Sequence, residues 1–134
     1  MPSPDFSTLI AAARQARQYA RADHSRYAVG AALETADGRL FTGANVECSS
    51  YGLSLCAERV ALVKALSEGA DRFTRLAVVT ASEPPASPCG ACRQMLWDYA
   101  RDLEIVLAGS DGEGDPVVTS LRELFPRGFG CEDL

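Results

Sequence analysis

The hydrophobic and polar positions of the chain switch between helical and strand spacing. Over residues 5–22 the apolar positions recur every three or four residues, which predicts an amphipathic first helix. These positions are Phe6, Leu9, Ile10, Ala13, Ala16 and Ala20. Residues 28–34 and 39–43 have the composition of strands, with Asp37-Gly38 between them. Because Asp-Gly is favoured in two-residue type I′ turns, the pair predicts a hairpin with that turn.

The middle of the chain continues as helix, strand and helix. We expect a helix over residues 56–67, with Gly69 near its end as the C-cap. A strand is predicted over residues 75–81, and its continuous apolar run indicates a central position in a sheet. The next helix is expected over residues 87–101, with Pro88 at the first helical position.

Two short strands complete the pattern, at residues 104–108 and 116–118. Only residues 109–115 lie between them, which is too few for a helical crossover, so this pair is expected to be antiparallel. The elements together predict an α/β protein with a mixed five-stranded sheet. A chain of 134 residues fits one domain, which we place at residues 1–134.

Charge and composition narrow the possible partners. The net charge is −5 and the pI is about 4.8, whereas nucleic-acid binding depends on Lys and Arg that neutralise phosphates. No segment approaches the ~20 apolar residues that a membrane span needs. The first residues lack the basic and apolar regions of a signal peptide. We therefore expect a cytoplasmic protein that binds neither nucleic acid nor membrane and acts on a small, uncharged substrate.

Three of the five cysteines have the spacing of metal ligands. Cys56 stands two residues before Glu58, and Cys89 and Cys92 lie in the segment Pro-Cys-Gly-Ala-Cys. Thiolates favour zinc, although iron occupies similar sulfur sites. Three protein ligands leave the fourth position of a tetrahedron for water, as in catalytic zinc sites. Both ligand segments are predicted at helix N-termini, where the partial positive charge favours thiolates.

Several segments resemble cytidine deaminase, in particular its short, homotetrameric branch with three cysteine ligands. They are Val29–Leu33, Gly43–Glu47, Ser50–Gly52, Leu55–Arg59 and Pro88–Gln94. The similarity runs from about Ser25 to the C-terminus. It implies a three-layer α/β/α fold around the mixed sheet. It also implies zinc-dependent hydrolysis of cytidine and 2′-deoxycytidine to uridine and 2′-deoxyuridine, with release of ammonia, as part of pyrimidine salvage.

The resemblance assigns the proton chemistry to Glu58, which would move protons between the zinc-bound water and the base. Three thiolates and Zn²⁺ sum to a charge of −1, and a negative centre activates water weakly. A compensating cation is therefore expected. Arg59 is the first candidate, because similar all-cysteine deaminases place an arginine beside the sulfurs at this position, and Arg93 is the second.

Substrate contacts are also implied by the resemblance. Asn45 and Glu47 alternate along an extended segment, so they point to the same side, and they would bind the ribose hydroxyls. Tyr27 stands where relatives usually have Phe and would pack against the nucleoside, and Tyr51 would line the same wall. Ala57 is assigned to the same substrate-binding set.

The C-terminal segment is the part of the chain for which the resemblance implies contact with a neighbouring subunit. Phe129 matches an aromatic residue that, in similar tetramers, reaches into the site of a neighbouring subunit and covers the base. The alternative is that Phe129 packs on the core of its own chain. The resemblance thus implies a homotetramer whose active sites are completed by neighbouring subunits.

The chain departs from the family pattern in two places. Asp23-His24-Ser25 replaces the usual Pro-Tyr-Ser, and Cys48 replaces a common Asn. His24 is the only histidine and has no metal partner or motif around it, so it is interpreted as a loop residue. Cys48 and Cys131 are interpreted as free thiols.

Three other functions compete with this interpretation. In a structural zinc domain, Cys48 or Cys131 would close the tetrahedron, but Glu58 and the Asn45-Val46-Glu47 segment would then have no role. A blasticidin-type aminonucleoside deaminase is the alternative among enzymes, although that family lacks this segment. A nucleotide or tRNA deaminase is disfavoured by the acidic charge and by the short connection between the last two strands.

Overall fold

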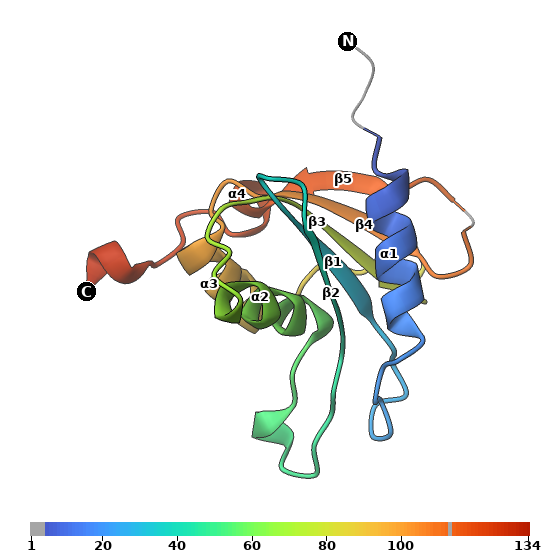
Figure 1. The fold of residues 1–134 in the computed structure, drawn as a ribbon. Helices are drawn as coiled ribbons and strands as arrows, with labels where there is room; N and C mark the ends of the chain where they lie inside the picture. Colours follow the sequence, from blue (N-terminus) through green and yellow to red (C-terminus); the bar gives the residue numbers. More distant parts are fainter. Residues whose placement is uncertain (1–4, 113) are drawn as a thin grey trace.

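The computed structural model describes residues 5–112 and 114–134. Its helices and strands alternate along most of the chain (Figure 1). In order they are α1 (Ser7–Arg17), β1 (Gly30–Thr35), β2 (Leu40–Ala44), α2 (Ala57–Ser67), β3 (Phe73–Thr80), α3 (Gly90–Tyr99), β4 (Glu104–Gly109), β5 (Val117–Ser120) and α4 (Leu121–Leu124). Short 3₁₀ helices lie at Tyr51–Leu53 and Cys131–Asp133.

The five strands form one mixed sheet in the order β2-β1-β3-β4-β5. The β3–β4 pair is parallel, and the other three pairs are antiparallel. The antiparallel pairing of β4 with β5 confirms the prediction from the short connection between them. The central position predicted for the third strand is also confirmed.

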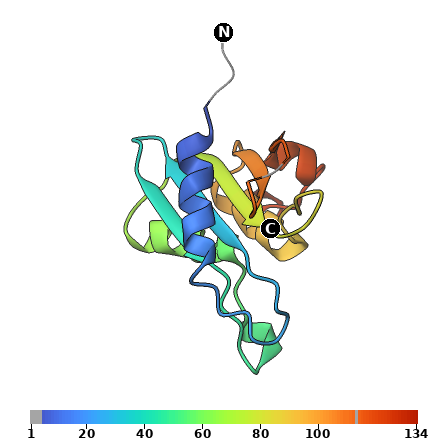
Figure 2. The ribbon, with the colours of Figure 1, turned by 90° about the vertical axis from the view of Figure 1, so that its right-hand side faces the viewer.

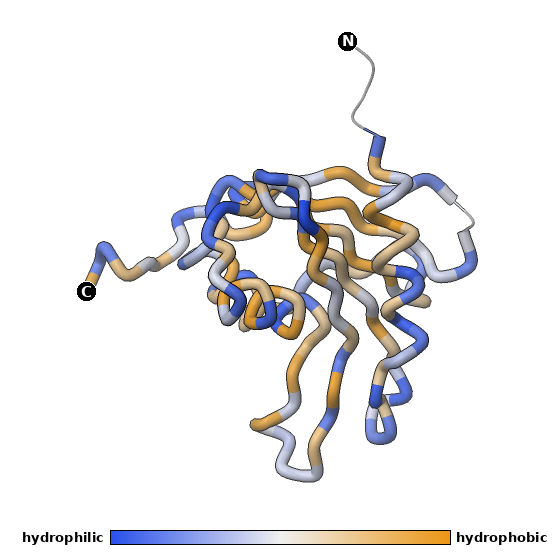
Figure 3. The backbone as a smooth tube through the Cα atoms, viewed as in Figure 1, coloured by the Kyte–Doolittle hydropathy of each residue, from blue (hydrophilic) through white to orange (hydrophobic). Residues whose placement is uncertain are grey.

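Helices cover both faces of the sheet, which gives the expected three layers. α1 lies against β1, β2 and β3 on one face, while α2 and α3 lie on the other (Figures 1 and 2). Side chains alternate accordingly along β3: Ala77 and Val79 belong to the core beneath α1, and Leu76 and Val78 to the core beneath α2 and α3. The strands contain many of the chain's hydrophobic residues, as the orange segments in Figure 3 show.

Two glycines allow the helices to approach the sheet closely. A Cβ atom at Gly30 would lie 2.0 Å from the backbone oxygen of Ala13 in α1. A Cβ atom at Gly43 would lie 2.4 Å from the backbone oxygen of Ala57 in α2. Both distances are far below van der Waals contact, so only glycine fits at these positions. The contact at Gly43 places the N-terminus of α2, which carries Cys56 and Glu58, directly beside β2.

Three local predictions need correction. The turn between β1 and β2 is not type I′, because Gly38 (φ +90°) has a positive φ and Asp37 does not. The amide of Gly38 donates to the Thr35 oxygen, and the amide of Thr35 donates to the Arg39 oxygen. This is a three-residue hairpin loop in which a type I turn is followed by a glycine in the left-handed region. Asp-Gly fits both loops, so the sequence predicted the hairpin but not its turn type.

The helix ends differ as well. α1 ends at Arg17 instead of Ala22, because the segment after it extends beside residues 45–47: the Arg21 amide donates to the Asn45 oxygen at 2.8 Å. α3 begins at Gly90 with Cys89 as its N-cap, so Pro88 lies outside the helix and not at its first position. The C-cap of α2 is Glu68, and Gly69, predicted as the C-cap, is the next residue, with a positive φ of 92°. The Gly69 and Ala70 amides donate to the carbonyl oxygens of the last turn, so Gly69 does end the helix.

A bidentate ion pair links β1 to β3 and predicts a pH effect on stability. Arg75 donates to both carboxylate oxygens of Glu34 at 2.8 Å, and these bonds hold the pKa of Glu34 below its ordinary value of 4.5. The stability from this pair is therefore present above that value and is lost as the pH falls through the lower, folded-state pKa. We expect Glu34→Gln to lower the free energy of unfolding by about 1 kcal/mol at pH 7 and by much less near pH 3. Urea unfolding at both pH values measures the difference, and an equal loss at both would contradict an ionic role for Glu34.

Candidate active site

Three cysteine sulfurs meet where two helices begin. Cys56 is the N-cap of α2, Cys89 is the N-cap of α3, and Cys92 lies in the first turn of α3. Their sulfur atoms lie within 4.8 Å of one another, and Cys89 Sγ is 3.6 Å from both of the others. Zinc with four ligands and Zn–S bonds of 2.3 Å separates its sulfurs by about 3.8 Å. The three sulfurs therefore fit a tetrahedral zinc ion that keeps one open position.

The surroundings of Cys56 favour its thiolate. Hydrogen bonding with the Cys92 sulfur, followed by contacts with Arg59 and Cys89, lowers the pKa of Cys56 to about 5. The hydrogen bond with the Cys56 sulfur, followed by burial, raises the pKa of Cys92. A bound metal would favour the deprotonated form of all three cysteines.

Glu58 lies in the first turn of α2 beside this cluster and is only 4% exposed. Burial is the main cause that raises its pKa to about 7, and the nearby Cys56 thiolate adds to the effect. A carboxyl group with a pKa near neutrality can both accept and return a proton at physiological pH. Glu58 is thus buried next to the sulfur cluster and does not lie on a solvated helix surface.

Arg59 and Arg93, the two candidate cations, differ in their contacts. Arg59 Nη2 lies 3.6 Å from Cys56 Sγ and 3.4 Å from the Ser54 oxygen. Arg93 instead donates to the carbonyl oxygens of Pro88 and Leu124, both at 2.7 Å, and to the Ser87 hydroxyl. Arg59 is therefore the cation beside the sulfurs, whereas Arg93 ties the segment before Cys89 to the end of α4.

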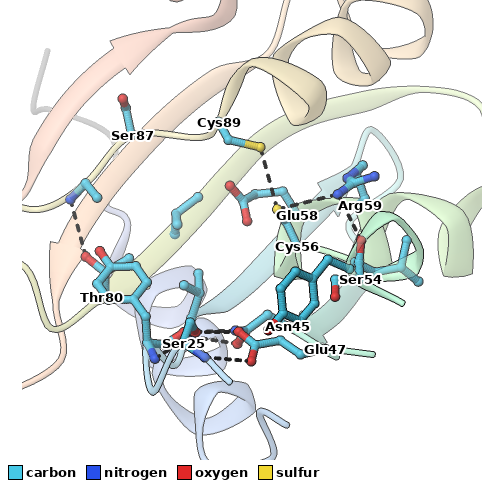
Figure 4. Close-up of a pocket in the computed structure, with 16 residues that line it drawn as sticks. Ser25, Asn45, Glu47, Ser54, Cys56, Glu58, Arg59, Thr80, Ser87 and Cys89 are labelled. Carbon is cyan, nitrogen blue, oxygen red and sulfur yellow. Dashed lines mark hydrogen bonds between the residues drawn. The ribbon is translucent and has the colours of Figure 1, made fainter. Parts of the chain in front are cut away.

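A cavity of about 440 Å³ opens beside the cluster (Figure 4). The residues that line it come from five separate segments of the chain. They include Tyr27, Asn45 and Glu47 together with Cys56, Glu58 and Cys89. The structure thus brings four of the expected substrate contacts, Tyr27, Asn45, Glu47 and Tyr51, into one pocket with the metal site. In Figure 4, Glu58 lies near the sulfurs and Glu47 lies farther from them.

Asn45 and Glu47 both line the pocket, as the alternation predicted, and both are held by the segment that precedes β1. The Asn45 side chain accepts from the Val29 amide and donates to the Tyr27 oxygen, each at 2.9 Å. Glu47 accepts from the backbone amides of His24 (2.8 Å) and Ser25 (3.0 Å) and from the Ser25 hydroxyl. The Ser25 bonds keep the pKa of Glu47 below its ordinary value, so Glu47 is an anionic acceptor in the pocket.

The other predicted contacts are placed in different ways. Tyr27 and Tyr51 line the pocket. Ala57 is fully buried and is the first residue of α2. Its backbone amide has no acceptor within the helix, so this amide is the group with which Ala57 can bind a substrate. Phe129 is 53% exposed in the C-terminal segment and does not line the pocket. Its exposure argues against the alternative that it packs on its own core.

Some pocket residues were not predicted from the sequence. Ser25, Ser54, Thr80 and Ser87 all line it, and small hydroxyl residues in loops carry no spacing signal. His24 is an exposed loop residue, as expected, although its ring contacts that of Tyr51 at a centroid distance of 5.4 Å.

The leftover cysteines stay outside the metal cluster. Within residues 5–112 and 114–134, the cluster contains only the three predicted cysteines. Cys48 and Cys131 are free thiols. The structural zinc alternative, which needed one of them as a fourth ligand, therefore loses its support.

The fold and the site together define a zinc-binding hydrolase of the α/β class. Residues 4–108 match the family model described as the cytidine and deoxycytidylate deaminase zinc-binding region. A cytidine deaminase from Halalkalibacterium halodurans is 44% identical over 131 residues, which cover 97% of this chain and 98% of that protein. The chain belongs to the cytidine deaminase family.

Solved structures agree with this membership. The crystal structure of cytidine deaminase from Burkholderia pseudomallei is 46% identical, with a TM-score of 0.89 over 94% of this chain and 100% of that one. The cytidine deaminase structure from Mycobacterium tuberculosis is 39% identical, with a TM-score of 0.81 over 96% and 99% of the two chains. A blasticidin-S deaminase from Bacillus cereus is a more distant relative, at 30% identity over 112 residues.

Proposed function

We propose that this protein deaminates cytidine and 2′-deoxycytidine by hydrolysis, giving uridine or 2′-deoxyuridine and ammonia. One observation carries the proposal: the buried Glu58 adjoins three cysteine sulfurs in the same cavity that holds Asn45 and Glu47. Such an arrangement would bring a proton carrier, a metal site and polar groups that can bind a sugar to a single cavity. The similarity to proteins named cytidine deaminase supports the same substrate.

Glu58 would carry each proton in the reaction. Water adds to C4 of the base, and Glu58 accepts the proton that the water gives up and delivers it to N3. The C4–N4 bond then breaks, and the amine leaves as ammonia after it receives the second proton by the same route. A zinc ion held by Cys56, Cys89 and Cys92 would supply the Lewis acid that lowers the pKa of the water.

The opposite end of the pocket would bind the sugar. The Glu47 carboxylate suits a hydroxyl donor, and Asn45 keeps one free N–H and one free lone pair beyond its two backbone bonds. Tyr27 and Tyr51 would flank the nucleoside, and the Ala57 amide at the start of α2 would bind the base. The anionic Glu47 would repel a phosphate, which favours nucleosides over nucleotides.

We further propose that residues 1–134 form one deaminase domain and that four copies assemble into a homotetramer. Phe129 is exposed and outside its own pocket, which suits a residue that completes the site of a neighbouring subunit. A role in pyrimidine salvage and a cytoplasmic location fit the proposed substrate. In the described part of the chain, each helix is too short or too polar to cross a membrane.

A substrate panel tests the proposed function. Zinc-loaded protein is mixed separately with cytidine, 2′-deoxycytidine, cytidine 5′-monophosphate and blasticidin S, and the products are separated by chromatography. We expect both nucleosides to be deaminated and the other two compounds to remain. Turnover of blasticidin S with intact cytidine would favour the alternative aminonucleoside deaminase instead.

Arg59 gives a second test of the metal site. Because its guanidinium lies beside Cys56 Sγ, we expect Arg59→Gln to retain zinc but to lower kcat about 10- to 100-fold, as removal of groups beside metal ligands does. The kcat and the zinc content of the same preparation are measured, with Arg72→Gln, an exposed position away from the pocket, as the matched control. An unchanged kcat in Arg59→Gln would remove the charge-compensation role.

A further inference from the structure

Tyr27 and Ser82 connect two segments of the chain that both contribute residues to the pocket. Their hydroxyl groups form a hydrogen bond, which we call the Tyr27–Ser82 bridge. Tyr27 belongs to the segment before β1, and Ser82 to the segment between β3 and α3. Among the residues that the structure describes, this is the only side-chain hydrogen bond between these two segments, and it joins residues 55 positions apart. The bridge therefore joins two segments that both contribute residues to the pocket, and it uses neither Glu58 nor a metal ligand.

The first of these segments holds both sugar-binding candidates. The Tyr27 carbonyl oxygen accepts from the Asn45 side chain at 2.9 Å. The Tyr27 amide donates to the Ser25 hydroxyl oxygen at 3.0 Å, and the same Ser25 hydroxyl donates to Glu47. Asn45 and Glu47 are thus both linked through hydrogen bonds to the backbone of Tyr27. A displacement of Tyr27 would move both acceptors.

The second segment is fixed to the metal end of the pocket. It leads from Ser82 to Cys89, and Arg93 binds its last residues through the Pro88 oxygen and the Ser87 hydroxyl, both at 2.7 Å. Within the segment, the Ala86 amide donates to the buried Thr80 hydroxyl at the end of β3, at 3.3 Å. Ser82 therefore offers Tyr27 an anchor on the part of the chain that also carries a metal ligand.

We propose that Tyr27 and Ser82 are positioning residues, whose bridge holds the sugar-binding pair at its place relative to the metal end. The inference rests on the proposed function and goes beyond it, because the Tyr27 hydroxyl acts here through Ser82 and not on the substrate. It follows that loss of the bridge weakens binding of a nucleoside with sugar hydroxyls. The rate of the chemical step, which Glu58 and the metal site determine, stays the same.

A double-mutant cycle tests the proposal. Tyr27→Phe keeps the ring and loses the hydroxyl, and Ser82→Ala loses the other partner. Each is expected to raise KM for cytidine about 2- to 10-fold, the range of one hydrogen bond, with kcat within twofold of the wild type. The double variant is expected to equal either single variant, because one shared bond is lost. Ser82→Thr, which keeps a hydroxyl, is expected to restore a KM close to that of the wild type.

A second substrate distinguishes a specific effect on sugar binding from a general destabilisation of the fold by the substitutions. With 2′,3′-dideoxycytidine, which lacks both hydroxyl groups on the sugar ring, the kcat/KM of Ser82→Ala is expected to equal that of the wild type. Tyr99→Phe and Ser67→Ala, exposed positions in α3 and α2, serve as matched controls. Equal losses on both substrates, additive losses in the double variant, or an unchanged KM for cytidine would each overturn the proposal.

Hydrogen–deuterium exchange tests the Tyr27–Ser82 bridge independently of the proposed function, because it requires no turnover. Without substrate, Tyr27→Phe and Ser82→Ala should both speed amide exchange in residues 23–29 and 81–87, while the controls should not. If the wild type fails to deaminate cytidine, the proposed function is wrong. Unchanged exchange in both segments would in turn refute the bridge, whatever the turnover.

Discussion

Glu58→Gln is expected to lower kcat for cytidine by about 10³-fold, within the range that proton transfer by a positioned side chain contributes. The amide has nearly the same shape as the carboxyl group, so the buried position stays filled, but it cannot accept and return a proton. Glu58 is not one of the clustered sulfur ligands, so the zinc content should remain that of the wild type. The measurement is kcat at saturating cytidine, with zinc determined on the same sample.

A matched control for this prediction lies in the same helix. Glu68 is exposed at the C-terminal end of α2, and Glu68→Gln should leave kcat within twofold of the wild type. If Glu58→Gln kept more than a tenth of the wild-type kcat with full zinc, another group would have to carry the protons.

Cys92→Ser is expected to abolish zinc binding at micromolar concentrations and turnover with it. Cys92 is fully buried and its sulfur clusters with those of Cys56 and Cys89, whereas the hydroxyl group of serine is a poor ligand for zinc. Removal of groups that only touch the ligands already lowers metal affinity about 10- to 100-fold, so we expect a larger loss here. The variant should also unfold at a lower temperature than the zinc-loaded wild type, because a metal that binds the folded state stabilises it.

Cys48 and Cys131 supply the controls for the Cys92 variant. Both are free thiols outside the cluster, so Cys48→Ser and Cys131→Ser should retain one zinc per chain and wild-type kcat. Elemental analysis and cytidine turnover compare the three variants. Loss of zinc in either control would mean that the metal site extends beyond the three predicted ligands.

The metal site could be predicted from the sequence because its ligands are local features. Cys56 and Cys89 each stand at the start of a helix, and Cys92 follows one turn later, so short motifs fix their positions along the backbone. The antiparallel β4–β5 pair was predictable for a similar reason, since a short connection permits no crossover. Such features depend on neighbouring residues, which a sequence displays directly.

The hydrogen bonds around the sugar-binding candidates depend instead on distant segments. Glu47 is held by Ser25 and His24, and Arg26 adopts a positive φ of 59° in the same turn, which its residue type does not indicate. The early end of α1 has a similar cause, because the bond from Arg21 to Asn45 draws the chain away from the helix. These arrangements follow from tertiary contacts that no local spacing reveals.

The proposed zinc-dependent deamination of cytidine is tested most directly by measuring cytidine turnover against zinc content. Metal-free protein is loaded with increasing zinc, and the ultraviolet absorbance change on conversion of cytidine to uridine is followed at each level. We expect turnover to rise in proportion to the zinc content and to stop rising at one zinc per chain. Fully loaded protein that leaves cytidine unchanged, or turnover that does not depend on zinc, would contradict it.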